Sequence, residues 1–238
     1  MDLDKVTKYV EKLLPKYAVV SLVFCFAWNC FVYWSTQFLC AGREHFDLTT
    51  DFDRWVPVQS WWVLIYVASF LFWVVCYIFT ARLNEKEFWF RFVTADLLSR
   101  TVCGVIFIIL PTTNVRPELA MDSVWDVMLS IIYRLDMPYD LFPSIHCMAS
   151  WFSCIAVRKN RKIPNWYKAF SVLMTVMVVI STLALRQHVW QDAAAGILLA
   201  EVTWQISRRT NGWQIYRRLT EKIANKLGNR TGMKRDGK

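Results

Sequence analysis

Long apolar runs separated by short polar links dominate the pattern of the chain. Six of these runs are candidate membrane spans: residues 17–39, 58–80, 90–110, 144–157, 167–185 and 188–206. A helix needs about 20 mostly apolar residues to cross a bilayer, and irregular backbone cannot face lipid because its polar groups would stay unpaired. The pattern therefore predicts an all-α fold, a polytopic membrane helix bundle of six transmembrane helices.

Shorter amphipathic segments flank and interrupt these runs. Residues 2–15 and 213–227 each place apolar side chains near one helical face, with basic residues between them. Segments of this kind lie on a membrane surface. Residues 124–135 keep a helical period inside the long link 111–142. We expect amphipathic interfacial helices at both termini and a short interfacial helix in this link.

Composition supports a membrane protein over a soluble one. Hydrophobic residues make up 55% of the chain, charged residues only 20%, and there are 13 Trp, a residue that gathers at membrane interfaces. The net charge of +9 lies mainly in the links, so membrane orientation explains it better than a nucleic-acid partner. The seven cysteines lack paired metal-type spacing, and we expect no metal and no cofactor. No short leader with a cleavage site is evident, so the first span would be an uncleaved anchor.

The basic residues also predict an orientation, because Lys and Arg in short links mark the cytoplasmic side. With six spans, 22 of the 28 Lys and Arg residues fall on one side and five on the other. Arg100 lies inside the third span, four residues after Asp96, and we interpret these two as a structural ion pair. Both termini should then be cytoplasmic, and the links that hold His45 and Arg116 should face outward.

Three separate segments bring side chains suited to phosphate chemistry to that outward level. His146 and His188 stand at the starts of the fourth and sixth spans, and Arg116 follows the third. Asp192 lies four residues after His188, hence on the same helical face, where a carboxylate can hold one imidazole nitrogen protonated and leave the other as a nucleophile. Arg116 and Arg186 offer forked donors that match phosphate oxygens.

Two further features fit an anion at this place. Ser144 can cap the fourth helix, whose N-terminus favours negative charge. His146 lies in the first turn of that helix and could protonate a leaving oxygen. Each residue alone also has a structural interpretation, as an interface anchor or a buried polar group. Together they meet the needs of phosphoryl transfer, which are charge stabilisation, a positioned nucleophile and an acid.

The order and spacing of these residues resemble the type 2 phosphatidic acid phosphatase superfamily. That family has the motifs Lys-x6-Arg-Pro, Pro-Ser-Gly-His and Ser-Arg-x5-His-x3-Asp. This chain has Arg116-Pro117, then Pro143-Ser144-Ile145-His146, then Ser181-Thr182 followed by His188 and Asp192 at the family spacing. Ile109, Ile145 and Thr182 stand where the motifs have Lys, Gly and Arg. The surrounding sequence is similar to a branch that includes inositol-phosphorylceramide-synthase-like proteins.

The resemblance implies roles for these residues. His188 would be the nucleophile that forms a phosphohistidine, Asp192 would orient it, and His146 would be the acid for the leaving group. Arg116 and Ser144 would bind the phosphate. Arg186 or Arg100 would have to replace the missing motif cations, and the sequence does not choose between them.

Three functions stay open at this point. The first is a metal-independent lipid phosphate phosphatase, with phosphatidate, a polyprenyl diphosphate or a sphingolipid-type phosphate as substrate. The second is a transferase that passes a phospho-headgroup to a lipid hydroxyl from the same site. The third is a non-enzymatic membrane transporter or scaffold, in which the histidines and Asp192 bind a metal or a proton.

We expect the chain to divide into three segments and to reside in a membrane. Residues 1–16 would form an amphipathic cytoplasmic interfacial helix, 17–207 the six-span catalytic membrane domain, and 208–238 a basic cytoplasmic tail. We expect an integral multi-pass protein of a bacterial plasma membrane. Its partners would be the bilayer and a lipid phosphate, and its active site would face outward.

Overall fold

A computed structural model describes residues 14–233 and is built almost entirely of helices. Every one of the six apolar runs forms a helix. They are α2 (Lys16–Cys40), α4 (Val63–Leu83), α5 (Lys86–Ile109), α7 (Ile145–Val157), α8 (Asn165–Ala184) and α9 (Trp190–Arg209). For the described part of the chain, the expectation of an all-α fold is therefore confirmed, with one pair of two-residue strands beside the helices.

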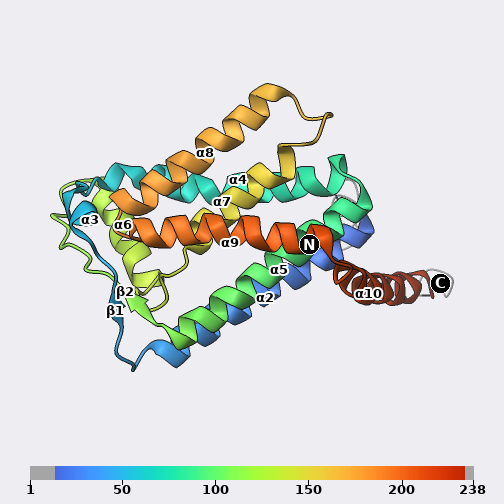
Figure 1. Ribbon diagram of the computed structural model, residues 1–238, viewed down its shortest axis with the longest axis horizontal. Coiled ribbons are helices and arrows are strands. Elements are labelled where there is room, and N and C mark those ends of the chain that lie inside the picture. The colour runs from blue at the N-terminus through green and yellow to red at the C-terminus, as the bar shows by residue number, and fades with distance from the viewer. Residues whose placement is uncertain (1–13, 234–238) are drawn as a thin grey trace.

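These six helices alternate in direction, so their connections gather at two opposite ends of the bundle (Figure 1). One end holds the longer connections and the small elements α3 (Asp51–Trp55), η1 (Ser60–Trp62), α6 (Val124–Leu135), β1 (Phe46–Asp47) and β2 (Thr112–Thr113). The other end holds the short α4–α5 and α7–α8 links and the beginning of α10 (Trp213–Met233), which projects from the bundle. The candidate chemistry lies at the first end.

The helix α6 confirms the short helix expected within the link 111–142. Ser123 is its N-cap, with Oγ accepting from the backbone N–H of Asp126, while the Asp126 carboxylate accepts from the backbone N–H of Ser123. This reciprocal cap satisfies two backbone donors that would otherwise be unpaired. The strands β1 and β2 pair in parallel, Phe46 with Thr112, and so tie the connection after α2 to the one after α5.

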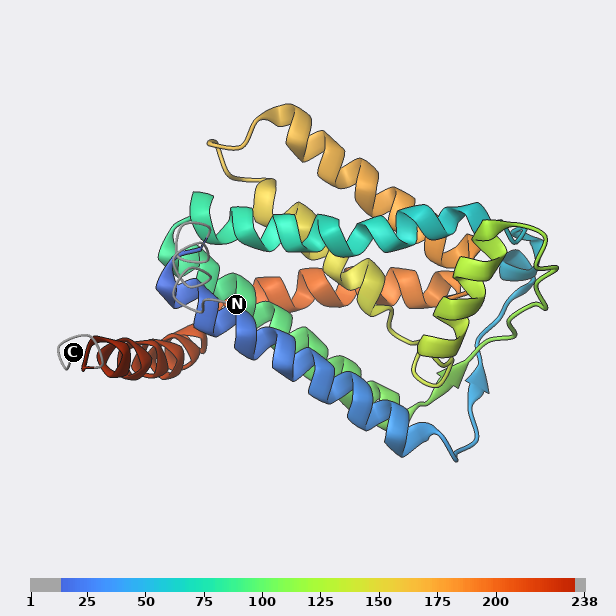
Figure 2. The same ribbon diagram turned by 180° about the vertical axis from the view of Figure 1, so that it is seen from behind.

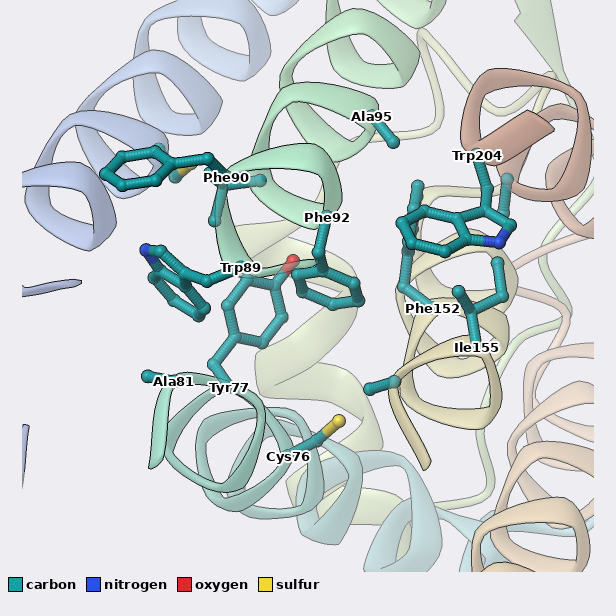
Figure 3. Packing of buried hydrophobic residues seen from close by; sticks show 14 of the residues in the cluster. Cys76, Tyr77, Ala81, Trp89, Phe90, Phe92, Ala95, Phe152, Ile155 and Trp204 are labelled. Atoms are coloured by element: carbon teal, nitrogen blue, oxygen red, sulfur yellow. The ribbon is translucent and has the colours of Figure 1, made fainter. Parts of the chain in front are cut away.

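The helix α7 is the central element of the bundle. Nearly all of its side chains after the first turn are buried, and it packs between α4, α8 and α9 (Figure 2). Aromatic residues from neighbouring helices surround it, and Figure 3 shows Phe92 of α5 beside Phe152 of α7, with ring centroids 5.5 Å apart. Such close packing fixes α7, and with it the residues at its N-terminus.

The outer surface of the bundle is strongly apolar. Large exposed side chains include Phe26, Phe38 and Leu71, which are 70%, 84% and 68% exposed. An apolar surface of this extent would be unstable in water and suits lipid. Among residues 14–233, four helices are long and apolar enough to cross a membrane: Tyr17–Cys40, Ser60–Leu83, Lys86–Ile109 and Asn165–Ala184. They are compatible with a multi-pass membrane protein.

The fourth and sixth expected spans do not meet that criterion within residues 14–233. The helix α7 has 13 residues, which is about 20 Å at 1.5 Å per residue, against a hydrocarbon core of about 30 Å. The helix α9 is 20 residues long, but Asp192, Glu201 and two arginines lower its hydropathy. Six transmembrane helices are therefore not established by length and composition.

The expected amphipathic helix at residues 1–16 lies almost entirely outside the described residues. The basic tail does form a helix, α10. Trp213 is buried against the bundle, with the Arg91 guanidinium 5.0 Å from its ring centroid. Ile215 and Leu219 are exposed at 62% and 58%.

Candidate active site

A tight turn between α8 and α9 positions His188. The helix α8 ends at Ala184, and Arg186 takes a left-handed conformation with φ 51°. The backbone N–H groups of Gln187 and His188 both donate to the carbonyl of Thr182, at 2.9 and 3.1 Å. This geometry reverses the chain within a few residues and holds His188 directly before α9.

The Asp192 carboxylate fixes the imidazole of His188. Its Oδ2 lies 3.3 Å from Nδ1 of His188 and also accepts from the backbone N–H of Val189 at 3.0 Å. Because a carboxylate accepts a hydrogen bond from an Nδ1–H group, Asp192 favours the tautomer of His188 whose free lone pair is on Nε2. From α3, Asp53 accepts from the backbone N–H of Trp190 at 2.9 Å and so binds another donor at the start of α9.

A close approach of α7 to α9 positions His146. Ser144 is the N-cap of α7, and its Oγ accepts from the N–H of Cys147 at 3.3 Å. Its own backbone N–H donates to the carbonyl of Asp192 at 2.9 Å. A Cβ added at Gly196 would lie 2.3 Å from the carbonyl oxygen of Ser144. Only glycine therefore lets the first turn of α7 lie this close to α9.

The two histidines face one another. Nε2 of His188 lies 3.4 Å from Nδ1 of His146, and the ring centroids are 5.6 Å apart. The His146 ring also packs against Tyr66 and Trp73 of α4, at centroid distances of 4.7 and 5.6 Å. Asp192, His188 and His146 thus form a continuous row, with an aromatic wall on the side of His146.

Arg116 reaches the same region from the link after α5. Its Nη1 donates to the backbone carbonyls of Tyr133, at 3.1 Å, and Asp136, at 2.5 Å, and its Nη2 donates to Oε1 of Gln187 at 2.9 Å. The guanidinium also stacks on the Tyr133 ring, 4.6 Å from its centroid. Burial lowers the pKa of Arg116 from its ordinary value, against the opposing effect of Asp136. The Arg116 guanidinium does not contact His188 itself; it binds the side chain of Gln187, the residue directly before His188.

The family model of the PAP2 superfamily matches residues 112–216. This match supports membership of the PAP2 superfamily, and it covers the segment that holds the candidate site. No curated protein matches the chain. The match suggests phosphatase-type activity on phosphate esters, which is that of a phosphoric ester hydrolase in general. All of the candidate site residues fall within the matched segment: Arg116, Ser144, His146, Arg186, His188 and Asp192.

Arg186, expected to bind phosphate in this PAP2 site, points elsewhere. Its Nη1 donates to the backbone carbonyl of Asp53, and its Nη2 donates to those of Arg54 and Val56 at 3.2 and 2.8 Å. The left-handed turn at Arg186 directs the side chain toward α3, away from the row of His146 and His188. The structure therefore gives Arg186 a role in holding the α3 connection and does not bring it to the histidines.

Ser144 is also placed differently from the expected phosphate ligand. It is fully buried, and its Oγ serves the N-terminus of α7. At the third PAP2 motif, Thr182 is buried as well, and its Oγ1 donates to the carbonyl of Val179 at 2.8 Å. The position that holds arginine in the family motif thus contributes no cation here.

Three buried polar atoms around His188 have no hydrogen-bond partner among the described residues. They are Nε of Arg116, Nε2 of Gln187 and Oδ1 of Asp192. Buried polar groups are nearly always paired in folded proteins, and exceptions often mark functional sites. Two of these atoms are donors and carry hydrogens that suit the oxygens of an anion.

His146 and His188 open on a cavity of about 710 Å³. Aromatic and aliphatic residues of α2 and α4 form nearly half of its wall, among them Phe26, Phe70 and Trp73. A concave, mainly apolar site with a few convergent polar groups is typical of a small-molecule site. Arg116 and Ser144 are not in the wall, so the two histidines are the expected site residues that reach this space.

Two aspartates that the sequence did not single out also line the cavity. Asp136 accepts from the hydroxyl of Tyr33 at 2.6 Å, and Asp140 accepts from Thr36 Oγ1 at 2.7 Å and from Gln37 Nε2. Burial raises the pKa of Asp140 to about 7. Both belong to the link before α7 and attach it to α2, so a segment that resembles an ordinary loop closes one side of the site.

Within residues 14–233, no three His, Cys, Asp or Glu side chains gather as they do around a metal ion. Of the site residues that the sequence analysis missed, Gln187 is the one that the sequence could have indicated, because it directly precedes His188. Asp136 and Asp140 have no such signal, since only the folded link brings them to α2.

Proposed function

We propose that this protein is a lipid phosphate phosphatase that acts through a phosphohistidine on His188, without a metal ion. The observation that carries the proposal is the row Asp192–His188–His146, with contacts of 3.3 and 3.4 Å. A carboxylate-oriented imidazole is a nucleophile, and a second imidazole beside it supplies proton transfer.

In the first half-reaction, Nε2 of His188 attacks phosphorus. An N–P bond forms as the bond from phosphorus to the leaving oxygen breaks, and His146 gives that oxygen a proton. The alcohol departs, and phosphohistidine remains at His188. Because Nε2 of His188 now faces Nδ1 of His146, substrate must displace this contact before attack.

In the second half-reaction, His146 takes a proton from water, and the oxygen of that water attacks phosphorus. The N–P bond breaks, its electron pair returns to Nε2, and free phosphate leaves. Arg116 and Gln187 do not line the cavity, so their partnerless donors must turn toward it to bind phosphoryl oxygens. There they would stabilise the charge that develops in both steps.

A lipid substrate accounts for the apolar cavity. Phe26 and Val23 of α2 line it and are 70% and 63% exposed on the outer surface. The space therefore continues to the face of the bundle that would meet acyl chains. Burial of an apolar lipid chain in this space would contribute a free energy of roughly 25 cal/mol for each Å² of apolar surface removed from water.

We further propose that all six helices occupy the membrane and that the site is extracytoplasmic. The helix α7 is short, but protein surrounds it, so it need not match the thickness of the lipid. The end with the histidines carries few basic residues, whereas most Lys and Arg lie at the other end. By the same rule, both termini are cytoplasmic.

A transferase at the same site is the second candidate, and the scarcity of cations favours it. Ile109 and Thr182 replace two motif cations, Arg186 points away, and Asp136 lines the cavity. A singly charged phosphodiester needs less positive charge than a doubly charged monoester. If the acceptor were a lipid hydroxyl in place of water, a phospho-headgroup would pass from one lipid to another. No specific observation favours a transporter or scaffold.

Purified protein in detergent separates the two enzymatic functions. Incubation with a diacylglycerol phosphate alone should release inorganic phosphate, and His188→Ala should release none. The transferase would instead leave phosphate release low and convert a mixture of phosphodiester lipid and lipid alcohol into a new phospholipid. If wild type and His188→Ala behave alike in both assays, the proposal is wrong.

A further inference from the structure

The cavity beneath the histidines contains a second polar group. Arg100, Asp96, Tyr77 and Asn29, from α5, α4 and α2, line it together with His146 and His188. The Arg100 side chain is paired with Asp96, since its Nε donates to both carboxylate oxygens at 3.0 Å. The expected ion pair is therefore present, and it faces a cavity that also holds the candidate catalytic groups.

The depth of this group follows from neighbouring contacts. Cys103 of α5 lies beside Met148 of α7, with their sulfurs 3.8 Å apart. The two helices run in opposite directions, so Arg100 is three residues deeper than Cys103, and His146 is two residues nearer the outer end than Met148. At 1.5 Å per residue, Arg100 is roughly 7–8 Å deeper in the bundle than His146.

The group retains a donor that has no acceptor in the described part of the chain. Nη1 of Arg100 donates to Oδ1 of Asn29, and the Arg100 guanidinium lies beside the Tyr77 side chain. The Tyr77 hydroxyl is buried and has no partner among residues 14–233. Figure 3 shows Tyr77 reaching from α4 toward α5. Tyr77 is 8% exposed and the Arg100 side chain 11%, so Tyr77 is more than nine-tenths buried, and a donor left unpaired there is costly.

We propose that Arg100 and Tyr77 bind an acyl carbonyl oxygen of the lipid whose phosphate lies between His146 and His188. The inference rests on the proposed function for that phosphate. Because Asp96 neutralises Arg100, the group has no net charge, which favours a neutral acceptor over a second phosphate. In an acyl lipid, a short polar linker joins the phosphate to the carbonyl groups, and the apolar chain follows. The cavity has the same order: histidines, a polar pair, then the apolar residues Leu22 and Val23.

Lipid binding to the inactive variant His188→Ala tests the carbonyl site without turnover. A diacylglycerol phosphate and its dialkyl ether counterpart of equal chain length differ only in the two carbonyl oxygens. We expect the ester lipid to bind about tenfold more tightly in detergent micelles, which corresponds to about 1.4 kcal/mol, because its carbonyl oxygen accepts hydrogen bonds that the ether lacks. Equal dissociation constants for the two lipids would overturn the inference.

Tyr77→Phe supplies a mild second variant, and Tyr167→Phe is its matched control. Both tyrosines are buried with an unpaired hydroxyl, but Tyr167 belongs to α8 and does not line the cavity. Tyr77→Phe should reduce the preference for ester over ether at least twofold, and Tyr167→Phe should preserve it. An unchanged preference in Tyr77→Phe would remove that residue from the site.

Hydrolysis by the wild-type protein tests the carbonyl site and the phosphatase activity separately. If it cleaves ester and ether lipids with equal kcat/KM, the carbonyl site is wrong and the phosphatase stands. If it cleaves neither lipid but His188→Ala still prefers the ester, the carbonyl site stands and the phosphatase is wrong.

Discussion

Gly196 of α9 lies so close to Ser144 that a methyl group on its Cα would reach within 2.3 Å of the Ser144 carbonyl oxygen. That oxygen belongs to the first turn of α7, where it accepts from the N–H of Met148 at 3.0 Å. The same turn carries His146. The relative position of the two histidines therefore depends on the absence of a side chain at Gly196.

Gly196→Ala should consequently damage both stability and activity. The backbone at Ser144 would have to shift, and overpacking of this kind costs about 1–3 kcal/mol. We expect a lower melting temperature in detergent and a kcat reduced at least tenfold. Gly212→Ala is the matched control, because no atom lies within 4 Å of a Cβ there. Equal behaviour of the two variants would contradict the close approach of α7 and α9.

Asp192→Asn should abolish most activity while leaving the fold intact. The amide can donate to Nδ1 of His188 and so stabilise the wrong tautomer, with the proton on Nε2. We expect kcat to fall on the order of 10³- to 10⁴-fold, as in other carboxylate–histidine pairs. Steady-state phosphate release, compared with the exposed control Asp51→Asn, measures this. A loss below tenfold would mean that the carboxylate does not orient the nucleophile.

The two arginines beside the site should differ in their effect on kinetics. Arg116→Gln removes the cation next to Gln187 and should lower kcat/KM about 10²-fold, and it should also lower the melting temperature because its bonds to the carbonyls of Tyr133 and Asp136 are lost. Arg186→Gln removes donors to three backbone carbonyls and should mainly destabilise the protein, by about 2 kcal/mol. Measuring kcat and KM on the folded fraction of each variant separates an effect on catalysis from an effect on stability. An intact Arg186→Gln with a greatly raised KM would show that this residue binds phosphate after all.

Asp140 should make stability depend on pH. Burial raises its pKa from 3.8 to about 7, so the folded state holds this proton more tightly than the unfolded state does. The associated stability is fully present below about pH 4 and is lost as the pH rises to about 7. We expect melting temperatures to fall between pH 5 and pH 8, and to fall less in Asp140→Asn. Identical slopes for the two proteins would contradict the buried position of this carboxyl.

Much of the helical framework follows from the sequence, because periodicity and run length are local properties. The spacing of His188 and Asp192 also predicts their contact, since residues four apart share a helical face. Arg186 shows where such reasoning fails. Its nearness to His188 in the chain suggested a shared site, but one left-handed residue turns its side chain to the opposite side.

Other parts of the site depend on tertiary contacts that no local pattern contains. Asp136 and Asp140 belong to a polar link, and only its docking on α2 brings them to the cavity. Gly196 resembles any small residue of a membrane helix until the N-terminus of α7 is placed against it. The helix α7 was expected to span the membrane, but it is short, because residues packed on all sides by protein have no bilayer thickness to match.

The phosphohistidine is the central claim, and trapping it is the most direct test. An aryl phosphate needs little help from an acid, so His146→Gln should form the intermediate readily but hydrolyse it slowly. We predict that ³²P-labelled aryl phosphate, quenched in alkali, leaves nearly stoichiometric label on the peptide containing His188. Label on any other residue, or no label despite rapid release of the aryl alcohol, would contradict the mechanism.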